Sequence, residues 1–318
     1  MSDVKKIATR AAYGEALVQL GELDPKIMVL DADLAGATQT AKFRDAYPDR
    51  FVDCGIAEQN LMAVAAGLSL SGKTVFASTF AMFAAGRAFE QVRNSIGYPH
   101  LNVKIGATHG GISVGEDGAS HQCNEDFALM RSIPGMTVIC PADAVEAKAA
   151  TIAAAQYEGP VYLRYGRLAV PVLFDEETYE FEWGKGKVLK EGSDVAIIAN
   201  GLMVNEALIA AEQLKTEGIS AGVINIHTLK PLDEELVLAA AKKYGCIVTA
   251  EEHNIIGGLG SAVLEALSET CPVPVVRVGV NDVFGRSGPA KELLDLYGLN
   301  AEHIVESAKK AIDLKKGN

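Results

Sequence analysis

The stretch D-C-G-I-A-E-Q-N-L-M-A-V-A-A-G-L-S-L, residues 53–70, decides the fold class together with F-A-S-T-F-A-M-F at residues 76–83. An apolar run ends at Val52, Gly55 interrupts it, and apolar residues then recur at the spacing of a helix. Glu58 therefore stands where a loop enters a helix, and the partial positive charge of a helix amino-terminus favours an ionised carboxylate there. Spacing alone leaves two interpretations open: an ordinary acidic residue of a first helical turn, or a carboxylate that serves a site.

The helix predicted after Glu58 has a narrow side, because it contains several residues with almost no side chain: Ala63, Ala65, Ala66 and Gly67. Such a side suits close packing against another backbone, including that of a partner chain. Residues 74–83 then predict a second strand that runs into a second helix, with Phe80 and Phe83 on one helical face. Both rings could belong to the core, or one could stack on a flat heteroaromatic ligand.

Short apolar runs separated by helical stretches recur through the first half of the chain, at residues 27–30, 51–52, 74–77, 103–107, 136–140 and 161–165. Uninterrupted apolar strands that alternate with helices are typical of a parallel sheet covered on both faces. Such sheets bind ligands in the loops beyond the carboxyl ends of their strands. Asp33, Glu58 and His109 all follow predicted strands, so we expect them in such loops.

The character of the sequence changes after residue 173. Residues 174–189 are acidic, contain glycine and aromatic residues and lack helical periodicity, so we expect a linker that lies against the surface. Strand and helix patterns then alternate again towards the carboxyl terminus. The sequence therefore predicts an α/β protein of two doubly wound domains with mostly parallel sheets, over residues 1–173 and 190–318.

The composition predicts a soluble globular protein of the cytoplasm. The 318 residues are 49% hydrophobic and 22% charged, and no apolar run approaches the ~20 residues of a membrane span. The net charge of −12 argues against nucleic acid or an anionic membrane as a partner, so any phosphate-bearing ligand must be held by a few placed arginines. The cysteines are odd in number and form no C-x-x-C pair, which indicates free thiols in a reducing compartment.

His109 and His121 flank a glycine-rich loop, G-G-I-S-V-G-E-D-G-A-S. A zinc site would need a third nitrogen or sulfur ligand nearby, and the H-Q-C segment that ends at Cys123 has poor geometry for shared chelation. We therefore expect no metal ligands here, and we interpret the two imidazoles as groups that bind substrate hydroxyls and move protons near neutral pH. The glycines would let the backbone approach a sugar closely.

Three segments together, G-I-A-E-Q-N, T-F-A-M-F and H-G-G-I-S-V-G-E-D-G-A-S-H-Q, resemble the pyrimidine-binding domain of thiamine-diphosphate enzymes of the transketolase type. Further along, V-A-I-I-A-N-G, I-H-T-L-K-P-L-D and F-G-R-S-G-P resemble the carboxy-terminal domain of the same family. The resemblance covers nearly the whole chain in the right order. It implies that Glu58 bonds the aminopyrimidine ring of the cofactor and that Phe83, with Phe80 beside it, stacks on that ring. His121 and His109 would act in catalysis by handling hydroxyl protons.

The resemblance also implies a set of substrate-binding residues: Arg10, Asp33, His109, Asp117, His121 and Arg167. The two arginines of that set match family positions that contact the sugar phosphate, and a guanidinium fork suits phosphate oxygens. Two positions depart from the family pattern. Ala37 stands in place of a serine that contacts phosphate, and Gly86 stands in place of a tyrosine of the cofactor wall.

A motif of single-chain transketolases, G-D-G with a downstream asparagine, does not occur in this sequence. In the family those groups hold Mg²⁺ and the diphosphate of the cofactor. The resemblance therefore implies the carboxy-terminal subunit of a two-chain transketolase of the pentose phosphate pathway, active only with an amino-terminal subunit that holds Mg²⁺. Two copies of this chain would pair about a twofold axis. With two partner chains they would form a heterotetramer that acts on sugar phosphates.

The implied reaction is transfer of a two-carbon ketol unit from a ketose or its phosphate to an aldose or its phosphate, through thiamine diphosphate. Three alternatives remain open. Deoxyxylulose-phosphate synthases resemble the chain around T-F and H-Q but usually lack a histidine at the position of His109. The beta subunit of oxo-acid dehydrogenases lacks the histidine loop. A non-catalytic scaffold subunit would have no need of Glu58, both histidines and both arginines together.

Overall fold

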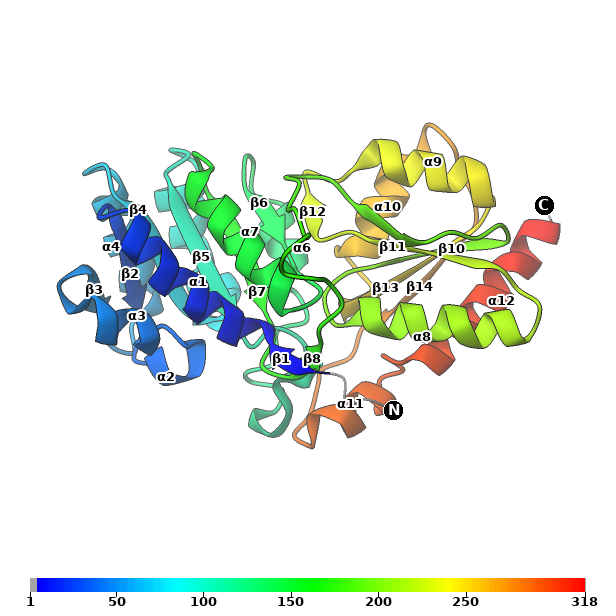
Figure 1. Cartoon of the computed structure of the whole chain (residues 1–318), viewed down its shortest axis with the longest axis horizontal. Coiled ribbons are helices and arrows are strands. Elements are labelled where there is room, and N and C mark those ends of the chain that lie inside the picture. Colours follow the sequence, from blue (N-terminus) through cyan, green and yellow to red (C-terminus); the bar gives the residue numbers. More distant parts are fainter. Residues whose placement is uncertain (1–4, 318) are drawn as a thin grey trace.

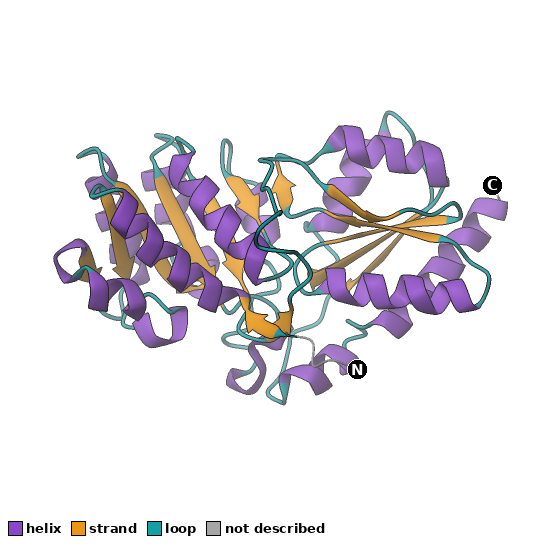
Figure 2. Ribbon diagram, viewed as in Figure 1, coloured by secondary structure: helices purple, strands orange, loops and turns teal. Residues whose placement is uncertain are grey.

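The computed structural model describes residues 5–317, which form two α/β halves joined side by side (Figure 1). Each half has a central sheet with helices on both of its faces (Figure 2). A short antiparallel pair, β1 (Lys6–Ala8) and β8 (Ala169–Pro171), lies below the junction of the halves in Figure 1. This architecture confirms the predicted fold class of two doubly wound units with mostly parallel sheets.

The first sheet has the strand order β12-β6-β7-β5-β4-β2-β3 within the described residues. Its parallel strands are β2 (Ile27–Asp31), β3 (Phe51–Asp53), β4 (Thr74–Phe80), β5 (Val103–Thr108), β6 (Thr137–Ile139) and β7 (Val161–Tyr165). Every residue of β4, β5 and β7 is buried, which explains the continuous apolar runs of the sequence. The strand order reverses between β2 and β4, and doubly wound sheets bind ligands beyond the carboxyl ends of strands at such a point.

Helices cover both faces of this sheet. On one face lie α1 (Thr9–Leu23), α3 (Ala41–Ala46) and α7 (Ala144–Gln156), and on the other lie α4 (Glu58–Ser69), α6 (Asp126–Arg131) and two π-helices over Met82–Arg87 and Val92–Gly97. Two short helices, α2 (Ala35–Thr38) and α5 (Phe89–Gln91), complete the half. One side of α1 is buried against the sheet, at Ala12, Ala16, Leu17 and Leu20.

One local prediction is wrong. Phe80 and Phe83 do not share a helical face, because Phe80 is the last residue of β4 and Phe83 belongs to the π-helix that follows. The alternation in T-F-A-M-F carries no boundary signal such as Gly, Pro or a capping residue, so spacing alone could not locate the end of the strand.

The second sheet has the order β14-β13-β10-β11-β9 within the described residues. Its strands are β9 (Lys187–Lys190), β10 (Val195–Ala199), β11 (Ala221–Asn225), β13 (Ile247–Asn254) and β14 (Val275–Val280), and β9 alone among them runs antiparallel to its neighbour. Figure 1 shows α9 (Glu234–Tyr244) and α10 (Leu259–Ser268) on one face, with α8 (Met203–Thr216) and α12 (Ala301–Gly317) on the other. The short helix α11 (Ala290–Leu296) packs against the loop that contains residues 112–117.

The two halves are joined by more than the chain between them. β12 (Thr228–Lys230) leaves the second half and pairs antiparallel with β6 at the edge of the first sheet. The intervening segment lies against the surface, as predicted, because Trp183 stacks on Tyr157 at 4.5 Å and Phe181 packs on His227 at 4.4 Å between ring centroids. Residues 187–189, which the sequence assigned to the linker, take part in β9. The domain limits at residues 173 and 190 stay a prediction.

Within residues 5–317, no helix combines the length and the apolar character that crossing a membrane requires. The cysteines at positions 54, 123, 140, 246 and 271 are free thiols, as predicted.

Candidate active site

Glu58 is the first residue of α4, as the sequence predicts. Gly55, with a φ of 70°, turns the chain from the end of β3 toward this helix. The carboxylate is buried, with 2% of the residue exposed, and its Oε2 accepts a hydrogen bond of 3.0 Å from Nη1 of Arg87. Within the described residues its Oε1 accepts no hydrogen bond, although a carboxylate can accept several. Glu58 can therefore take a further donor from a ligand.

Four flat groups follow one another at the carboxyl edge of the first sheet. The ring of His109 stacks on Phe80, with centroids 3.9 Å apart and planes 27° apart, and Phe80 stacks on Phe83 at 5.8 Å and 16°. The guanidinium of Arg87 lies over Phe83, with Cζ 4.5 Å from the ring centroid. The ring of His121 meets Phe83 edge-on at 5.3 Å. We call the four stacked groups, which are the rings of His109, Phe80 and Phe83 and the guanidinium of Arg87, the aromatic column.

The π-helix over Met82–Arg87 brings Arg87 to the end of this column. A π-helix inserts an extra residue into a helical turn, and such turns are frequent at functional sites. A Cβ at Gly86 would lie 2.1 Å from Cε of Met82, the end of a flexible side chain that can move aside. The structure gives no reason for the departure from the family tyrosine at this position.

His109 directly follows β5, has a left-handed backbone (φ 59°) and is buried. Its Nδ1 lies 2.8 Å from Oγ1 of Thr108, and its Nε2 lies 3.2 Å from Nη1 of Arg10. An arginine can only donate, so Nε2 accepts and Nδ1–H donates to Thr108. Burial, together with the charges of Arg10, Arg167 and His121, lowers the pKa of His109 to about 3. His109 is therefore neutral near pH 7, and its catalytic role stays a prediction.

His121 differs from His109 in burial and in contacts. It is half-buried, and its Nδ1 lies 3.0 Å from Oγ of Ser120. Its Nε2 makes no hydrogen bond within the part of the chain that the structure describes. Of the two imidazoles singled out from the sequence, His121 is the one whose second nitrogen is open to a substrate proton, and its catalytic role stays a prediction.

The two predicted phosphate arginines lie close enough to affect one another. Nη1 of Arg10 donates to the carbonyl oxygen of Ala37 at 2.7 Å, and Nη1 of Arg167 donates to Oε2 of Glu116 at 3.0 Å and to the carbonyl oxygen of Val114. Burial lowers the pKa of Arg10, and the charge of Arg167 lowers it as well. An anion bound to both guanidinium groups would relieve this repulsion. Ala37 lacks the hydroxyl of the family serine, but its backbone carbonyl contacts Arg10.

Asp33 and Asp117 flank this group, and neither forms a hydrogen bond or ion pair with another predicted site residue in the described chain. Asp33 is exposed, adopts a left-handed φ of 61° and donates its backbone N–H to Oδ1 of Asp53 at 3.0 Å. Asp117 is exposed at the end of a short 3₁₀-helix, Ile112–Asp117. Their contacts with substrate therefore stay predictions.

Asp31 is a residue that sequence reasoning missed. It is buried at the end of β2, where its Oδ2 accepts from the hydroxyls of Thr38 (2.7 Å) and Thr40 (2.9 Å) and its Oδ1 accepts from the N–H of Leu34 (2.6 Å). Burial raises the pKa of Asp31 to about 6. This carboxyl shapes the loop that carries Asp33. The D-A-D segment directly after an apolar strand was the available signal, because ligand sites lie beyond the carboxyl ends of such strands.

Two glycines of the histidine loop are required by packing within the chain itself. A Cβ at Gly110 would lie 2.0 Å from Nε of Arg164, and one at Gly111 would lie 2.4 Å from Cδ of Glu252. These two glycines make room for buried charged side chains. The expectation that the loop glycines admit the backbone to a sugar stays a prediction.

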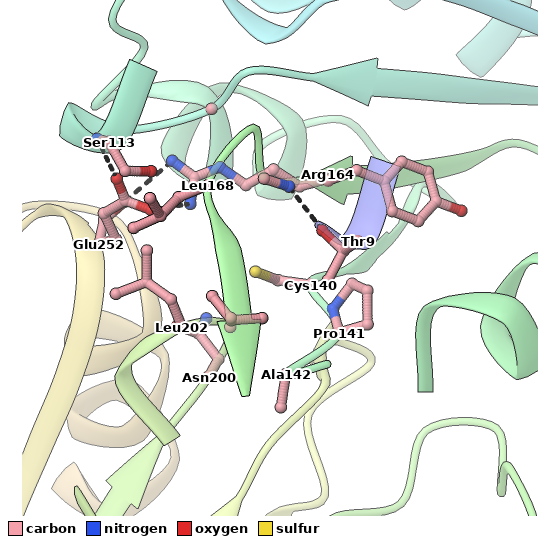
Figure 3. Close-up of a pocket in the computed structure, with 15 residues that line it drawn as sticks. Thr9, Ser113, Cys140, Pro141, Ala142, Arg164, Leu168, Asn200, Leu202 and Glu252 are labelled. Atoms are coloured by element: carbon pink, nitrogen blue, oxygen red, sulfur yellow. Dashed lines mark hydrogen bonds and ion pairs between the residues drawn. The ribbon is translucent and has the colours of Figure 1, made fainter. Parts of the chain in front are cut away.

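Those charged side chains form a buried cluster between the two halves (Figure 3). Nε of Arg164 lies 3.0 Å from Oδ2 of Asp126, and Nη2 of Arg164 donates to the carbonyl oxygen of Glu252 at 2.9 Å. Oε1 of Glu252 in turn accepts from the N–H of Ser113 at 2.6 Å. A cavity of about 20 Å³ lies beside them, and no predicted site residue lines it. The cluster anchors the histidine loop and lies apart from the aromatic column.

The contacts described above join most of the residues singled out from the sequence with one that was missed: Glu58, Phe80, Phe83, His109, His121, Arg10 and Arg87. Arg167 joins them through its charge, and Asp33 and Asp117 border them. Arg87 was missed because its position depends on the extra residue of a π-helix, and local periodicity in the sequence does not reveal such a residue. What results is a flat apolar wall beside a buried carboxylate, with two arginines further along the same edge.

Comparison with known proteins gives consistent family matches. Residues 5–172 match the family described as transketolase, pyrimidine binding domain, and residues 184–304 match transketolase, C-terminal domain. The chain is 52% identical, over 93% of its length and 94% of the relative, to a protein of Methanocaldococcus jannaschii described as a transketolase C-terminal section. It is 45% identical to a 6-deoxy-6-sulfo-D-fructose transketolase subunit of Clostridium sp., over 96% of this chain and 95% of that one.

Solved structures give the same result. A split gene transketolase, described as an inactive β4 tetramer, has a TM-score of 0.90 and 56% identity, and the match covers 98% of this chain and 100% of that one. A Pichia stipitis transketolase in complex with sedoheptulose 7-phosphate has a TM-score of 0.84 and 26% identity, and the match covers 99% of this chain and 47% of that one. The chain thus spans about half the length of such longer transketolases.

Fold and site together define an α/β protein of two doubly wound halves, with a buried carboxylate beside a flat apolar wall at the edge of the first sheet. The chain belongs to the transketolase family. It is similar along nearly its whole length to C-terminal sections and subunits of that family.

Proposed function

We propose that this chain is the carboxy-terminal subunit of a two-chain transketolase, which transfers a two-carbon ketol unit from a ketose, free or phosphorylated, to an aldose. The observation that carries the proposal is the aromatic column beside the buried carboxylate of Glu58. The length match to relatives named as transketolase sections or subunits supports the same conclusion.

Thiamine diphosphate fits the groups at this edge. Its aminopyrimidine is a flat ring with a nitrogen that can bond a carboxylate, and Phe83 and the open Oε1 of Glu58 supply a stacking face and that carboxylate. Phe80 would complete the wall behind Phe83. When bound, the cofactor supplies the electron sink that lets a carbon–carbon bond of the ketose break. Because the sequence has no G-D-G motif, we assign Mg²⁺ and the diphosphate to an amino-terminal partner subunit.

The two histidines take different roles in this proposal. His121 has an open Nε2 and an ordinary half-buried setting, so it would accept and return hydroxyl protons of the sugar. His109 is held neutral, and it would position Arg10 and the wall residue Phe80, which it contacts directly. The sequence could not make this division, because both residues border the same loop.

The substrate would be bound at the open end of the same edge. Arg10 and Arg167 would share the phosphate of a sugar phosphate, and Arg167 would exchange its exposed partner Glu116 for that phosphate. Asp33 and Asp117 border this end and are exposed, which suits contacts with sugar hydroxyls. A relative named for an apulose 4-phosphate transketolase and another named for a sulfo sugar support a phosphate-sized anion at this position, with the sugar itself open.

We further propose that two copies of this chain pair and that two partner chains complete a heterotetramer. The exposed side of α4 carries few side-chain atoms, since Ala63 and Gly67 lie on it. Large apolar residues stand near its two ends, where Ile56 is 78% and Leu70 is 74% exposed. Exposed large apolar side chains at both ends of this helix, with small residues on its exposed side, suit an interaction site. Because Glu58 begins the same helix, pairing through α4 would bring the cofactor edge to a subunit boundary.

The experiment compares the purified chain with the reconstituted pair. The chain alone, supplied with thiamine diphosphate, Mg²⁺ and a ketose–aldose pair, should be inactive, and addition of the amino-terminal subunit should restore ketol transfer. Donors and acceptors should include phosphorylated, sulfonated and unsubstituted sugars, so that the anion requirement is measured at the same time. Full activity of the lone chain would contradict the two-chain proposal, and no transfer by the pair with any sugar would contradict the transketolase proposal.

A further inference from the structure

Arg87 is the group at the edge that the proposed function does not use. Its Nη1 donates to Oε2 of Glu58 at 3.0 Å, and its Cζ lies 4.5 Å from the centroid of Phe83. In the described chain its side chain forms no other hydrogen bond. The two partners differ in solvent exposure, because 49% of the Arg87 side chain is exposed and only 2% of the Glu58 side chain is.

The two groups that Arg87 contacts are the two groups that would hold an aminopyrimidine. A guanidinium is flat, cationic and rich in N–H donors, so it can stack on an aromatic face and bond a carboxylate at once. The cofactor ring would need the same stacking face and the same carboxylate. Phe83 already has Phe80 stacked against it at 5.8 Å, and Arg87 lies over the ring as the last group of the column. A second flat group cannot occupy the place of the guanidinium while Arg87 remains there.

A buried carboxylate without a partner is costly, so Glu58 needs a donor whenever the cofactor is not bound. Arg87 supplies that donor from a side chain that stays half in water. Its other guanidinium nitrogens can be hydrated, which makes its departure much easier than that of a fully buried arginine such as Arg164. The π-helix that carries Arg87 delivers it to this position without any other contact that would hold it there.

We propose that Arg87 is a placeholder for the aminopyrimidine ring: it neutralises Glu58 and covers Phe83 in the chain without cofactor, and it swings out when the ring binds. The proposal rests on the proposed function, since it takes the cofactor to be thiamine diphosphate. Arg87 thus competes with the cofactor and sets its apparent affinity. A neutral, non-aromatic replacement removes the competitor and leaves the binding groups in place.

The test measures binding of thiamine diphosphate in the presence of Mg²⁺ to the reconstituted pair of subunits by titration calorimetry. Arg87→Met should lower the apparent Kd about three- to tenfold, because the ion pair and the cation–π contact no longer have to be broken. Arg87→Lys keeps the charge but loses the flat stacking group, and its Kd should fall between those of Arg87→Met and the wild type. Arg93→Met is the matched control, since Arg93 is exposed in the next π-helix and bonds only Asn94 within the described residues, and it should leave the Kd unchanged.

A second measurement uses the lone chain without cofactor. Arg87→Met should lower its thermal unfolding midpoint, because Glu58 loses its donor, and Arg93→Met should not. An unchanged midpoint in Arg87→Met would show that Arg87 does not neutralise Glu58, and would overturn the placeholder proposal. Cofactor binding that is equal or weaker in Arg87→Met than in the wild type would overturn it as well. If the wild-type pair binds no thiamine diphosphate, the proposed function fails first, so the two failures are distinguishable.

Discussion

Two places in this chain combine arginine with buried carboxylates, and they are built differently. The first is the buried cluster between the halves that contains Arg164, Asp126 and Glu252, which we call the seam. There, Arg164 is 4% exposed and its partner Asp126 is 0% exposed, so both charges are enclosed. At the edge of the first sheet, Glu58 is enclosed but Arg87 is half in water. Burial and the charges around Arg164 act in opposite directions there, and the carboxylates raise its pKa above the ordinary value.

The difference separates a fixed contact from an exchangeable one. Removal of one partner from an enclosed pair leaves an uncompensated buried charge, so neither partner can leave. A pair with one exposed member can open whenever a better donor reaches the buried carboxylate. The seam therefore supports the structure, and the edge offers groups to a ligand. Four predictions follow this contrast from the largest expected effect to the smallest.

Glu58→Gln tests the edge at its buried carboxylate. Turnover by the reconstituted pair should fall by about 100- to 10,000-fold, the range in which a positioned proton-transfer group contributes, because a neutral amide cannot stabilise a protonated ring nitrogen. Fold and assembly should be retained, since the side chain keeps its shape. Glu90→Gln is the control, because Glu90 is an exposed glutamate nearby. Near-normal turnover in Glu58→Gln would remove this residue from the mechanism.

Arg164→Met tests the seam. The substitution should lower the free energy of unfolding by about 3–5 kcal/mol, because Asp126 and Glu252 would then be buried without their cation. Arg44→Met removes an exposed pair with Asp45 and should cost less than about 1 kcal/mol. Urea unfolding monitored by the fluorescence of Trp183 compares the two variants. A loss in Arg164→Met as small as that in Arg44→Met would show that the seam is not fixed in the way its burial implies.

A further buried carboxyl between the two halves, that of Glu146, gives a prediction for the pH dependence of stability. Glu146 accepts from the N–H of Ala142 (2.7 Å), the hydroxyl of Tyr179 (2.5 Å) and Nδ2 of Asn225 (2.8 Å), and so ties the first half to the linker and the second half. Burial raises its pKa from 4.5 to about 7, against the effect of these donors. Between these two values the folded chain keeps a proton that the unfolded chain has already released.

The stability from Glu146 is therefore fully present below pH 4.5 and is lost as the pH rises to about 7. The loss amounts to at most about 3 kcal/mol, since one pKa unit corresponds to 1.36 kcal/mol. Unfolding free energies measured between pH 5 and 8 should fall with a slope that Glu146→Gln reduces, and the part that remains includes the contribution of Asp31, whose pKa is also raised. The variant should also be less stable overall, because its amide N–H₂ would face the N–H of Ala142. Equal slopes in the two chains would contradict this assignment.

The sequence predicted the framework of both regions better than their contacts. The start of α4 at Glu58, the apolar strands and the alternation of the two halves all follow from local periodicity, which operates within one element. The seam depends on side chains far apart in the chain, such as Arg164 and Glu252, and their meeting could be inferred only from the topology. The glycines at positions 110 and 111 show the same limit, because the side chains that require them lie in other elements.

The site itself was partly predictable. The resemblance to a family singled out Glu58, Phe83 and the two histidines, and the structure brings them together with Arg10. It could not separate the neutral His109 from His121, because burial and neighbouring charges decide a histidine pKa. Arg87 was not among the residues that the resemblance singled out, and only the structure shows that it lies over Phe83.

Arg10→Ala and Arg167→Ala give the smallest expected effects, and they test whether the edge is built for a ligand. Each should raise KM for phosphorylated sugars by about 10- to 150-fold, the equivalent of the roughly 1.5–3 kcal/mol of a charged hydrogen bond. Turnover at saturation should change little, because the phosphate is bound equally in ground and transition states. Equal losses with unphosphorylated sugars would make the arginines structural.

The two arginines should differ in their effect on the pKa of His109. Arg167 pairs with the exposed Glu116 and acts on the His109 ring only through its charge, so its removal should raise the pKa of that ring less. Arg10 also bonds Nε2 of His109, and its charge is one of the causes that lower the pKa of that ring. Arg10→Ala should therefore raise the pKa of His109 toward its ordinary value, and the His109 ring resonances in an NMR titration should move with it. If Arg167→Ala raised that pKa as much as Arg10→Ala, the direct contact between Arg10 and His109 would contribute nothing, and burial together with long-range charge would account for the neutral ring.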